Sequence, residues 1–410
     1  LETDNLTIGS AQGSDGQVLT STGSGVGWED ASGASDIDGL SDCLVENDSM
    51  WLGNDPSGTT DTASYCIGIG ATALDAITTG DYNTAVGYRA LSTSTSGTNN
   101  TCVGSYAGFK ITTGGYNVCI GHDAGASENG GITTGSANIL VGREIGTAIG
   151  SGNWNTAMGD NVLTTGEGGD YNCIFGEQAG RYAGAASQNC GYGSFTMYSA
   201  SSGGNFNTAL GHNAGYYIST GSSNICIGPY SGVFSGAGGL GAALTTGSEN
   251  ILIGAAGDTS AADSDNQIVM GSNVTGNADD SLCFGNYTTD SAIAFGATSI
   301  TAPSDIRLKE DIEDEVVGLD FINELRPVTF RWKKAKDVPE ELKAHSTSEK
   351  RVMNGKYNHG FISQEVKEVI DNNPNIKEGF DMWTEDEADG RQRIGESALI
   401  PMLVKSIQEL

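Results

Sequence analysis

Short segments of small or apolar residues, separated by polar turns, dominate the chain from residue 64 to residue 299. In words such as Thr84-Ala85-Val86, three small or apolar residues stand between an asparagine and a glycine. A second short segment follows, and then a turn rich in Thr and Gly, as at Thr112-Thr113-Gly114. Such a unit is too short and too glycine-rich for two helices, so it predicts strand, glycine corner, strand and turn.

The unit repeats with a near-constant period. A five-residue word, Asn-X-X-X-Gly, recurs mostly at a spacing of 17 residues, and degenerate copies begin at Ser64 and Ser281. The complete words begin at Asn83, Asn100, Asn117, Asn138, Asn155, Asn172, Asn189, Asn207, Asn224 and Asn250. A coil of this length forms one rung of a parallel β-roll or β-solenoid, whose rungs stack at roughly 4.8 Å. Stacking predicts an Asn column that bonds its neighbours and a Gly column that permits tight corners.

These words resemble two groups of repeats. They are similar to the head repeats of trimeric bacterial adhesins, which form left-handed parallel β-rolls. They resemble more closely the repeats of phage tail-fibre proteins, with words like Asn83-Thr84-Ala85-Val86-Gly87. The resemblance covers residues 64–299 and implies a homotrimer. A narrow roll has little interior, so burying its faces against two other chains is physically sensible.

The cysteines are expected to be buried free thiols. Five of them lie inside the repeat words, where other copies carry Ala, Val, Ile or Leu, so they act as small hydrophobes in a packed column. These five are Cys102, Cys119, Cys173, Cys190 and Cys226. No CxxC-type cluster is present, so the sequence predicts no metal site. Free thiols fit synthesis in a reducing cytoplasm.

Histidines and aromatic residues are the candidate binding groups of the array. His122 and His212 hold equivalent rung positions far apart in the stack, which favours surface residues over ligands. A set of aromatic residues just before the Asn words either forms a sugar-binding stripe or packs between chains at a trimer interface, and packing is the favoured interpretation. The set consists of Tyr82, Tyr116, Trp154, Tyr171 and Phe206.

Residues 1–63 are polar, acidic and rich in turn residues. The segments 17–20 and 26–28 predict a small hairpin around a Ser/Thr/Gly run. The stretch 13–30 is similar to a short module of phage fibre proteins, which implies a connector that joins or caps rods.

The residue pattern changes near Arg307, which predicts a separate domain over 300–410 with mixed helices and strands. The expected elements are a helix over 318–325, a strand over 328–332, a charged loop over 335–353, a strand over 357–362, a helix over 364–370 capped by Ser363, and a helix over 396–410. In the last helix, Ile400, Leu403, Ile407 and Leu410 are spaced as in a coiled-coil seam. We expect a trimeric stalk that the sequence cuts short.

This domain closely resembles the peptidase S74 family, the intramolecular chaperone domain of phage tail fibres and tailspikes. The matching words are Ser304-Asp305-Ile306-Arg307-Leu308-Lys309, 318–327, 359–366 and 399–410. The family implies a domain that guides trimer assembly and then cuts the chain between Pro303 and Ser304.

The resemblance assigns Ser304 as the nucleophile and Lys309 as its general base, a Ser-Lys variant of triad chemistry. Five residues separate them, which is not one face of a helix or strand, so a bend must bring them together. A lysine base must be neutral, so we expect burial or the neighbouring Arg307 to favour the neutral amine. His359 either assists or has a structural role. No cofactor is predicted.

The charge and hydropathy of the chain argue against nucleic-acid binding and against a membrane span. The formal net charge is −31, and residues 1–303 contribute 4 basic and 28 acidic residues. This argues against nucleic-acid binding, which depends on Lys and Arg. No apolar run is long enough for a membrane span. No signal peptide is visible at Leu1, and we expect the chain to be a fragment of something longer.

The sequence thus predicts a viral structural protein, a trimeric phage tail fibre or spike that is assembled in the host cytoplasm and carried on the virion. Its predicted partners are other tail proteins and a host cell-surface receptor, with polysaccharide among the candidates. A cell-surface trimeric adhesin and a polysaccharide-degrading tailspike remain as alternatives. The regular repeat argues against the tailspike enzyme, which needs paired carboxylates in a groove.

Overall fold

The computed structural model describes most of residues 43–410 and four short strands before them. The residues outside this description are 1–6, 9–10, 13–16, 22–25, 31–42, 54–55, 57, 128–129, 166–168, 183–184, 200–202, 234–242, 343, 377–379 and 387–389. The chain divides into two compact units, Leu1–Pro303 and Ser304–Leu410. Within the described part of the chain, no helix is long and apolar enough to cross a membrane.

The amino-terminal segment contains two antiparallel strand pairs. These are β1 (Thr7–Ile8) with β2 (Ala11–Gln12), and β3 (Gln17–Ser21) with β4 (Val26–Asp30). The second pair is the predicted hairpin, and its register places Leu19 opposite Trp28.

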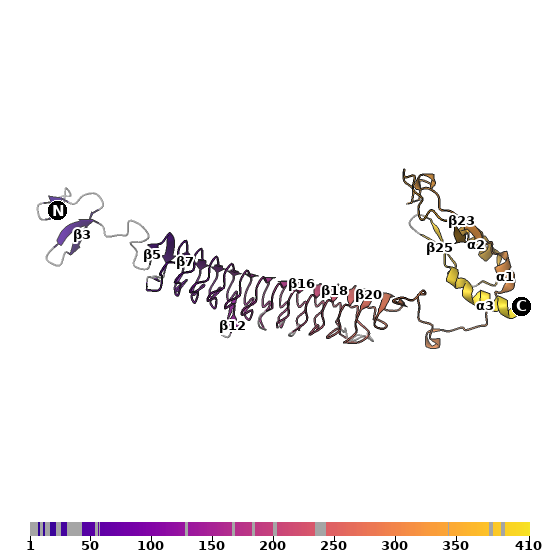
Figure 1. Cartoon of the computed structure of the whole chain (residues 1–410), viewed down its shortest axis with the longest axis horizontal. Helices are drawn as coiled ribbons and strands as arrows, with labels where there is room; N and C mark the ends of the chain where they lie inside the picture. The colour runs from indigo at the N-terminus through magenta and orange to yellow at the C-terminus, as the bar shows by residue number, and fades with distance from the viewer. Residues whose placement is uncertain are drawn as a thin grey trace, which may run out of the picture. The chain divides into compact units, whose positions relative to one another are not determined.

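One 16-stranded sheet runs along the repeat array, with its strands in chain order (Figure 1). Its strands are β5 (Cys43–Glu46), β6 (Ser49–Leu52), β7 (Ile67–Ile69), β8 (Thr84–Val86), β9 (Thr101–Val103), β10 (Val118–Ile120), β13 (Ile139–Val141), β14 (Thr156–Met158), β15 (Cys173–Phe175), β16 (Cys190–Tyr192), β17 (Thr208–Leu210), β18 (Ile225–Ile227), β19 (Ile251–Ile253), β20 (Gln267–Ser272), β21 (Ser281–Asn286) and β22 (Asp290–Ala294). Pairing is parallel from β6 to β21, whereas β5 and β22 pair antiparallel at the two ends. This confirms the predicted parallel β-solenoid with about 17 residues per turn.

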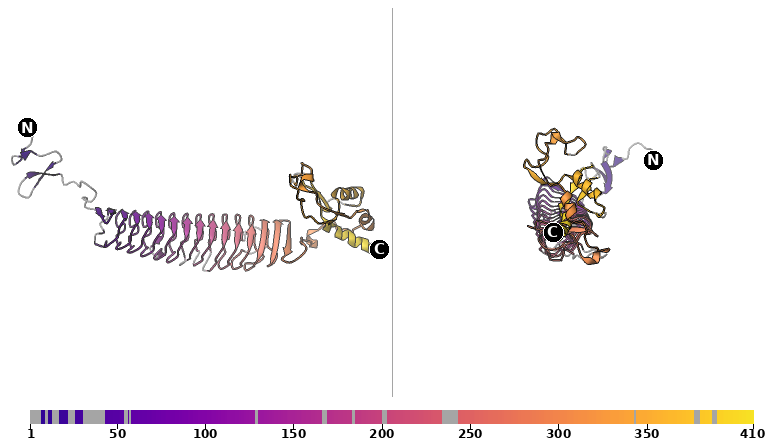
Figure 2. Two further views of the ribbon diagram at one scale, coloured as in Figure 1. Left: turned by 45° about the horizontal axis from the view of Figure 1, so that its top comes forward. Right: turned by 90° about the vertical axis from the view of Figure 1, so that its right-hand side faces the viewer.

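Two views of the ribbon show the short strands following one another as successive rungs (Figure 2). A separate antiparallel pair, β11 (Ala126–Ser127) with β12 (Gly130–Gly131), occupies the longer rung between Asn117 and Asn138. In the regular rungs the middle residue of each strand points inward, so Ala85, Cys102 and Leu140 are fully buried. Their neighbours on either side are at least partly exposed, as expected from the period of two in a strand.

The asparagine column lies inside the solenoid and forms a ladder of hydrogen bonds. Asn100 donates to Asn83 Oδ1 from its backbone N–H at 3.0 Å and from Nδ2 at 3.1 Å. Its Nδ2 also donates to the Gly114 carbonyl at 2.9 Å. The pattern recurs to Asn250, and every member is at most 5% exposed. Because an unpaired buried polar group costs about 1–3 kcal/mol, this ladder stabilises each rung against its neighbours.

Four residues after each asparagine, the corner requires glycine. Gly142 has φ +145°, and a Cβ added there would lie 1.8 Å from the Gly159 carbonyl oxygen in the next rung. A side chain at this corner would collide with backbone, which explains the predicted Gly column.

The interior is filled by complementary residue sizes. In several rungs a small inward strand residue, such as Ala85, is followed six positions later by a large one, such as Leu91. Where the strand residue is Cys102, the later position is Gly108, and a Cβ there would lie 2.4 Å from the Cys102 Sγ. These rungs therefore fill the interior with different divisions of side-chain volume.

The array begins earlier than predicted, and its first degenerate word is shifted. β6 pairs with β7, so the sheet extends upstream of residue 64. Ile67 pairs with Thr84, which places Cys66, not Ser64, in the asparagine column. In the sequence, either Gly68 or Gly70 could be the glycine that ends this word. The pairing of β7 with β8 shows that it is Gly70. A further rung that the sequence analysis missed has Gln267 in the column, where its N–H donates to Asn250 Oδ1 at 3.0 Å.

The cysteines are free thiols, but they do not share one environment. Cys102, Cys119 and Cys226 are inward and buried, and burial raises the pKa of the Cys226 thiol to about 12. Cys173 and Cys190 stand first in their strands and are only partly buried. The prediction of burial is wrong for these two, because adjacent strand positions face opposite sides.

The carboxy-terminal unit is a small α+β domain. Its elements are η2 (Ile306–Leu308), α1 (Leu319–Glu324), β23 (Val328–Phe330), η3 (Ala335–Asp337), β24 (Asn358–Gly360), α2 (Ser363–Asn372), β25 (Trp383–Glu385), β26 (Gln392–Ile394), η4 (Glu396–Leu399) and α3 (Ile400–Glu409). The strands form two antiparallel pairs, β23 with β24 and β25 with β26. Phe321, Val366 and Met382 lie at the centre of its one hydrophobic core.

The predicted helices and the first two strands of this unit are present; α2 is longer than predicted, and the other elements have shorter bounds. Ser363 is the first helical residue rather than the cap, and its hydroxyl donates to the Gln392 carbonyl at 3.4 Å. The last helix begins with a 3-10 turn and becomes α-helical at Ile400, next to Pro401. The β25–β26 pair was not predicted.

Candidate functional site

A tight turn at the start of the carboxy-terminal unit brings the two predicted site residues together. Ser304 and Lys309 flank the 3-10 helix η2, and Lys309 Nζ donates to Ser304 Oγ at 2.7 Å. This is the bend that the five-residue separation required. The pair has the distance at which a neutral amine can take a proton from a hydroxyl.

Asp305 holds this turn in shape. Its Oδ1 accepts from the Arg307 backbone N–H at 2.9 Å, which caps η2. Its Oδ2 also accepts from Arg307 Nη2 at 2.6 Å. The hydrogen bonds from Arg307 hold the pKa of the Asp305 carboxyl below its usual range. The sequence analysis missed this positioning role, although an Asp directly before a short turn is a familiar capping signal.

The surroundings of the pair differ from the expectation. Ser304 and Lys309 are both exposed in the single chain, so the expected burial around Lys309 is not present there. Arg307 is bound to Asp305 rather than directed at Lys309. His359 lies in β24 opposite Thr329 and lines a groove with Trp332 and Arg393. Among the described residues, His359 forms no hydrogen bond or ion pair with Ser304 or Lys309.

The last helix of the unit carries the predicted apolar seam. Met402 and Ser406 are buried on one side of α3, and Glu409 accepts from the Leu319 backbone N–H at 2.8 Å. This bond holds the pKa of the Glu409 carboxyl below its usual range. The seam residues on the other side remain exposed, with Ile400 at 58% and Ile407 at 72%. An apolar seam on an anchored helix is suited to packing against another helix.

A second apolar surface runs along the whole solenoid. In each rung strand of the long sheet from β6 to β21, the residue that aligns with the third X of the Asn-X-X-X-Gly word faces outward, and each of these residues is apolar or aromatic. These residues, which we call the sheet face, are Leu52, Ile69, Val86, Val103, Ile120, Val141, Met158, Phe175, Tyr192, Leu210, Ile227, Ile253, Met270 and Phe284. Met158 is 49% exposed and Ile120 is 39% exposed. A continuous apolar stripe of this length is typical of a surface that another chain covers.

The described part of the chain contains no group of three or more His, Cys, Asp or Glu residues able to hold a metal ion.

Comparison with known proteins assigns the carboxy-terminal unit. Residues 304–373 match the family model Peptidase_S74, described as chaperone of endosialidase. A search of curated proteins and a search of solved structures gave no match. The chain therefore carries a Peptidase_S74 domain behind a β-solenoid, and the matched segment begins at Ser304. The family points to a self-cleaving domain that promotes trimer assembly.

Proposed function

We propose that the chain is a homotrimeric fibre or spike protein of a phage virion, whose carboxy-terminal unit aligns three chains and then cuts itself away between Pro303 and Ser304. The observation that carries the proposal is the 2.7 Å contact between Lys309 Nζ and Ser304 Oγ at the first residue of the matched segment. The proposed cut also coincides with the junction between the two compact units.

In the proposed reaction, neutral Lys309 takes the hydroxyl proton of Ser304. Ser304 Oγ bonds to the Pro303 carbonyl carbon, of its own or a neighbouring chain, and the Pro303–Ser304 C–N bond breaks. The departing nitrogen takes the proton from Lys309. Water then hydrolyses the resulting ester, which leaves a Pro303 carboxylate and restores the Ser304 hydroxyl.

Assembly would switch this reaction on. A neighbouring chain that covered the η2 turn would remove water from Lys309 and favour its neutral form. The seam on α3 and the sheet face supply two apolar surfaces for such a neighbour. Cleavage is then coupled to trimer formation, so single chains are not cut before they assemble.

A fibre of this kind needs a separate register signal. Each rung resembles the next, so a slip of one rung between chains costs little locally. A domain that trimerises at one end raises the effective concentration of the chain ends and fixes their alignment. Once the domain has been removed, an unfolded shaft cannot readily reassemble. The resistance of the shaft to unfolding is then kinetic. Other tail proteins and a host cell-surface receptor are the partners that this role requires.

The test compares the parent chain with Ser304→Ala and Lys309→Met, with Ser346→Ala and Lys356→Met as matched controls on exposed residues of the same unit. Intact mass under denaturing conditions reports cleavage, and light scattering under native conditions reports the trimer. We expect both dyad variants to form trimers that stay uncut, and both controls to be cut. Trimers of Ser304→Ala that are cut like the parent would contradict the proposal.

A further inference from the structure

A continuous set of aromatic side chains covers the rungs that begin at Asn172, Asn189, Asn207 and Asn224. This aromatic patch consists of Tyr182, Phe195, Tyr198, His212, Tyr216, Tyr217 and Tyr230. Tyr198 and Tyr216 are stacked, with ring centroids 4.8 Å apart and planes at 12°. Tyr182 and Tyr217 extend the set through edge-on contacts, with ring centroids 5.0 Å from Tyr198 and 4.6 Å from Tyr216. The set follows the glycine corners, so it lies outside the sheet face.

The rung backbone holds the patch rigidly while its rings stay accessible. The Tyr182 N–H donates to the Tyr198 carbonyl at 3.0 Å, and the Tyr230 N–H donates to the His212 carbonyl at 2.9 Å. Tyr182, Tyr217 and Tyr230 are 42%, 43% and 42% exposed. Rigid aromatic surfaces bind ligands at a low cost in conformational entropy.

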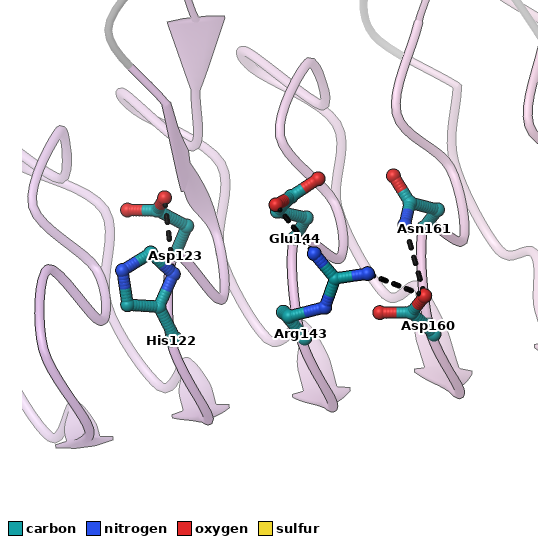
Figure 3. A network of polar contacts seen from close by, with 6 residues as sticks. All are labelled: His122, Asp123, Arg143, Glu144, Asp160 and Asn161. Carbon is teal, nitrogen blue, oxygen red and sulfur yellow. Dashed lines mark hydrogen bonds and ion pairs between the residues drawn. The ribbon is translucent and has the colours of Figure 1, made fainter.

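The patch lies in an uncharged stretch of a strongly acidic chain. Between Arg181 and Glu249 the sequence contains no Asp, Glu, Lys or Arg. Equivalent corner positions in earlier rungs carry a network of charges instead (Figure 3). There Arg143 pairs with both Glu144 and Asp160 at 2.8 Å, and His122 lies 3.2 Å from Asp123. Loss of all charge over consecutive rungs is thus a local feature and not a property of the array.

We propose that the aromatic patch binds a neutral glycan. A sugar ring combines an apolar C–H face with hydroxyl groups, and tyrosine offers a flat apolar ring with a polar tip. Burial raises the pKa of the Tyr198 and Tyr216 phenols, so both hydroxyls stay protonated donors. His212 adds a donor and an acceptor at the centre of the set. Arg181 is the cation beside the patch. It lies 5.6 Å over the Tyr182 ring and donates to Gln178 at 2.8 Å, so its charge is already engaged within the protein.

A second aromatic cluster of the solenoid, around Tyr106, has one cation over two of its rings. Arg89 lies 4.4 Å over the ring of Phe109 and 5.5 Å over that of Tyr106, so a cation already covers these ring faces. Tyr88 completes this cluster at 5.3 Å from Tyr106 and is 49% exposed. Tyr88→Ala is therefore a control that removes an exposed tyrosine from the same solenoid without touching the patch.

The experiment measures binding of the full chain to immobilised neutral hexasaccharides of glucose (maltose and cellulose type), mannose and N-acetylglucosamine, with hyaluronan and galacturonan hexasaccharides as anionic probes. We expect at least one neutral probe to bind, and Tyr217→Ala and Tyr182→Ala each to weaken it at least tenfold. Tyr217→Phe should lose less, and Tyr88→Ala should bind like the parent. The anionic probes should not bind.

Binding of no neutral probe, equal binding of anionic probes, or equal loss in Tyr88→Ala would overturn the inference. So would a change in oligomeric mass in Tyr217→Ala, because the patch would then be an interchain contact. The inference rests on the proposed function only for the statement that the glycan belongs to a host cell surface; the binding itself does not depend on it. Uncut Ser304→Ala trimers should bind as the parent does, so failure of cleavage and failure of binding remain distinguishable.

Discussion

The solenoid and the carboxy-terminal unit bury their apolar side chains in different ways: the solenoid repeats one small interior in each rung, and the carboxy-terminal unit has a single non-repeating core. In the solenoid, ten rungs repeat the same inward asparagine and corner glycine, and each rung contacts its immediate neighbours. The carboxy-terminal unit has one core around Phe321 and one arrangement of its elements. A repetitive structure is easily extended, but its similar rungs do not define one register between chains. A unique core, in contrast, specifies one arrangement of its elements. In this account, the unique unit supplies the alignment that the repeats lack.

The largest effect should follow from Phe321→Ala. Phe321 is 1% exposed at the centre of a small core, and such a truncation costs about 3–5 kcal/mol. We expect hydrogen exchange to show loss of protection throughout α1, α2 and α3, with loss of trimers and of cleavage. Tyr357→Ala, which removes a ring that is 70% exposed, is the control. A Phe321→Ala chain that assembles and is cut at the parent rate would contradict this division of roles.

Gly142→Ala should break the solenoid locally. The new Cβ would lie 1.8 Å from the Gly159 carbonyl oxygen at φ +145°, and strained backbone with a forced shift costs on the order of 3 kcal/mol. Loss of exchange protection should centre on β13 and β14 and leave distant rungs protected. Gly355→Ala, where nothing lies within 4 Å of the new Cβ, should leave its own unit unchanged. Uniform loss of exchange protection along the array would contradict the expectation that each rung is stabilised only by its nearest neighbours.

A smaller effect should depend on pH. Asp258 is 3% exposed inside the solenoid, and its Oδ1 has no hydrogen-bond partner among the described residues. Burial raises the pKa of this carboxyl to about 7, from 3.8 in the unfolded chain. Folding favours the protonated carboxyl of Asp258. Its contribution to the free energy of unfolding is therefore fully present below pH 3.8, the pKa in the unfolded chain, and is lost as the pH rises through about 7, the pKa in the folded chain. Between pH 5 and pH 8 the loss should be about 2–3 kcal/mol.

Hydrogen exchange of β19 and β20, corrected for intrinsic rates, measures this change. Asp258→Asn should abolish the pH dependence, whereas Asp263→Asn, on the exposed side of the same rung, should keep it. Equal protection of the parent at both pH values would show that Asp258 is not buried as described.

The smallest effect should come from Arg143→Ala. Its ion pairs with Glu144 and Asp160 are exposed, with 56% of the Arg143 side chain open to solvent. Exposed pairs of this kind are screened and contribute little. We expect no resolvable change in exchange protection of β13, even at low salt. A marked loss would show that surface charge holds the rungs together as strongly as the buried ladder does.

Local periodicity explains why much of the solenoid was predictable from the sequence. The Asn-X-X-X-Gly word determines the inward asparagine, the outward neighbours and the corner, and these follow from a strand period of two. The frame at Cys66 was not predictable, because Gly68 and Gly70 both satisfy the word and only pairing with β8 distinguishes them. The outward position of Cys173 was visible in the same period, since it stands one place before the inward residue of its word.

The candidate site was predictable only through its resemblance to a known family. Ser304 and Lys309 are five residues apart, and nothing in that spacing shows the η2 turn that joins them. The exposure of both residues depends on which other chains are present, which a single sequence does not encode. Ser363 failed as a cap because the helix begins one residue earlier and its hydroxyl bonds to β26 instead.

The most direct test of the central claim is the mass of the small fragment released from the full chain, with a trimeric coiled coil fused after Leu410 to guarantee assembly. The account predicts a fragment whose first residue is Ser304, which appears only in trimers and is absent from Ser304→Ala. A trimeric chain that releases no fragment, or a fragment that begins at any other residue, would contradict it.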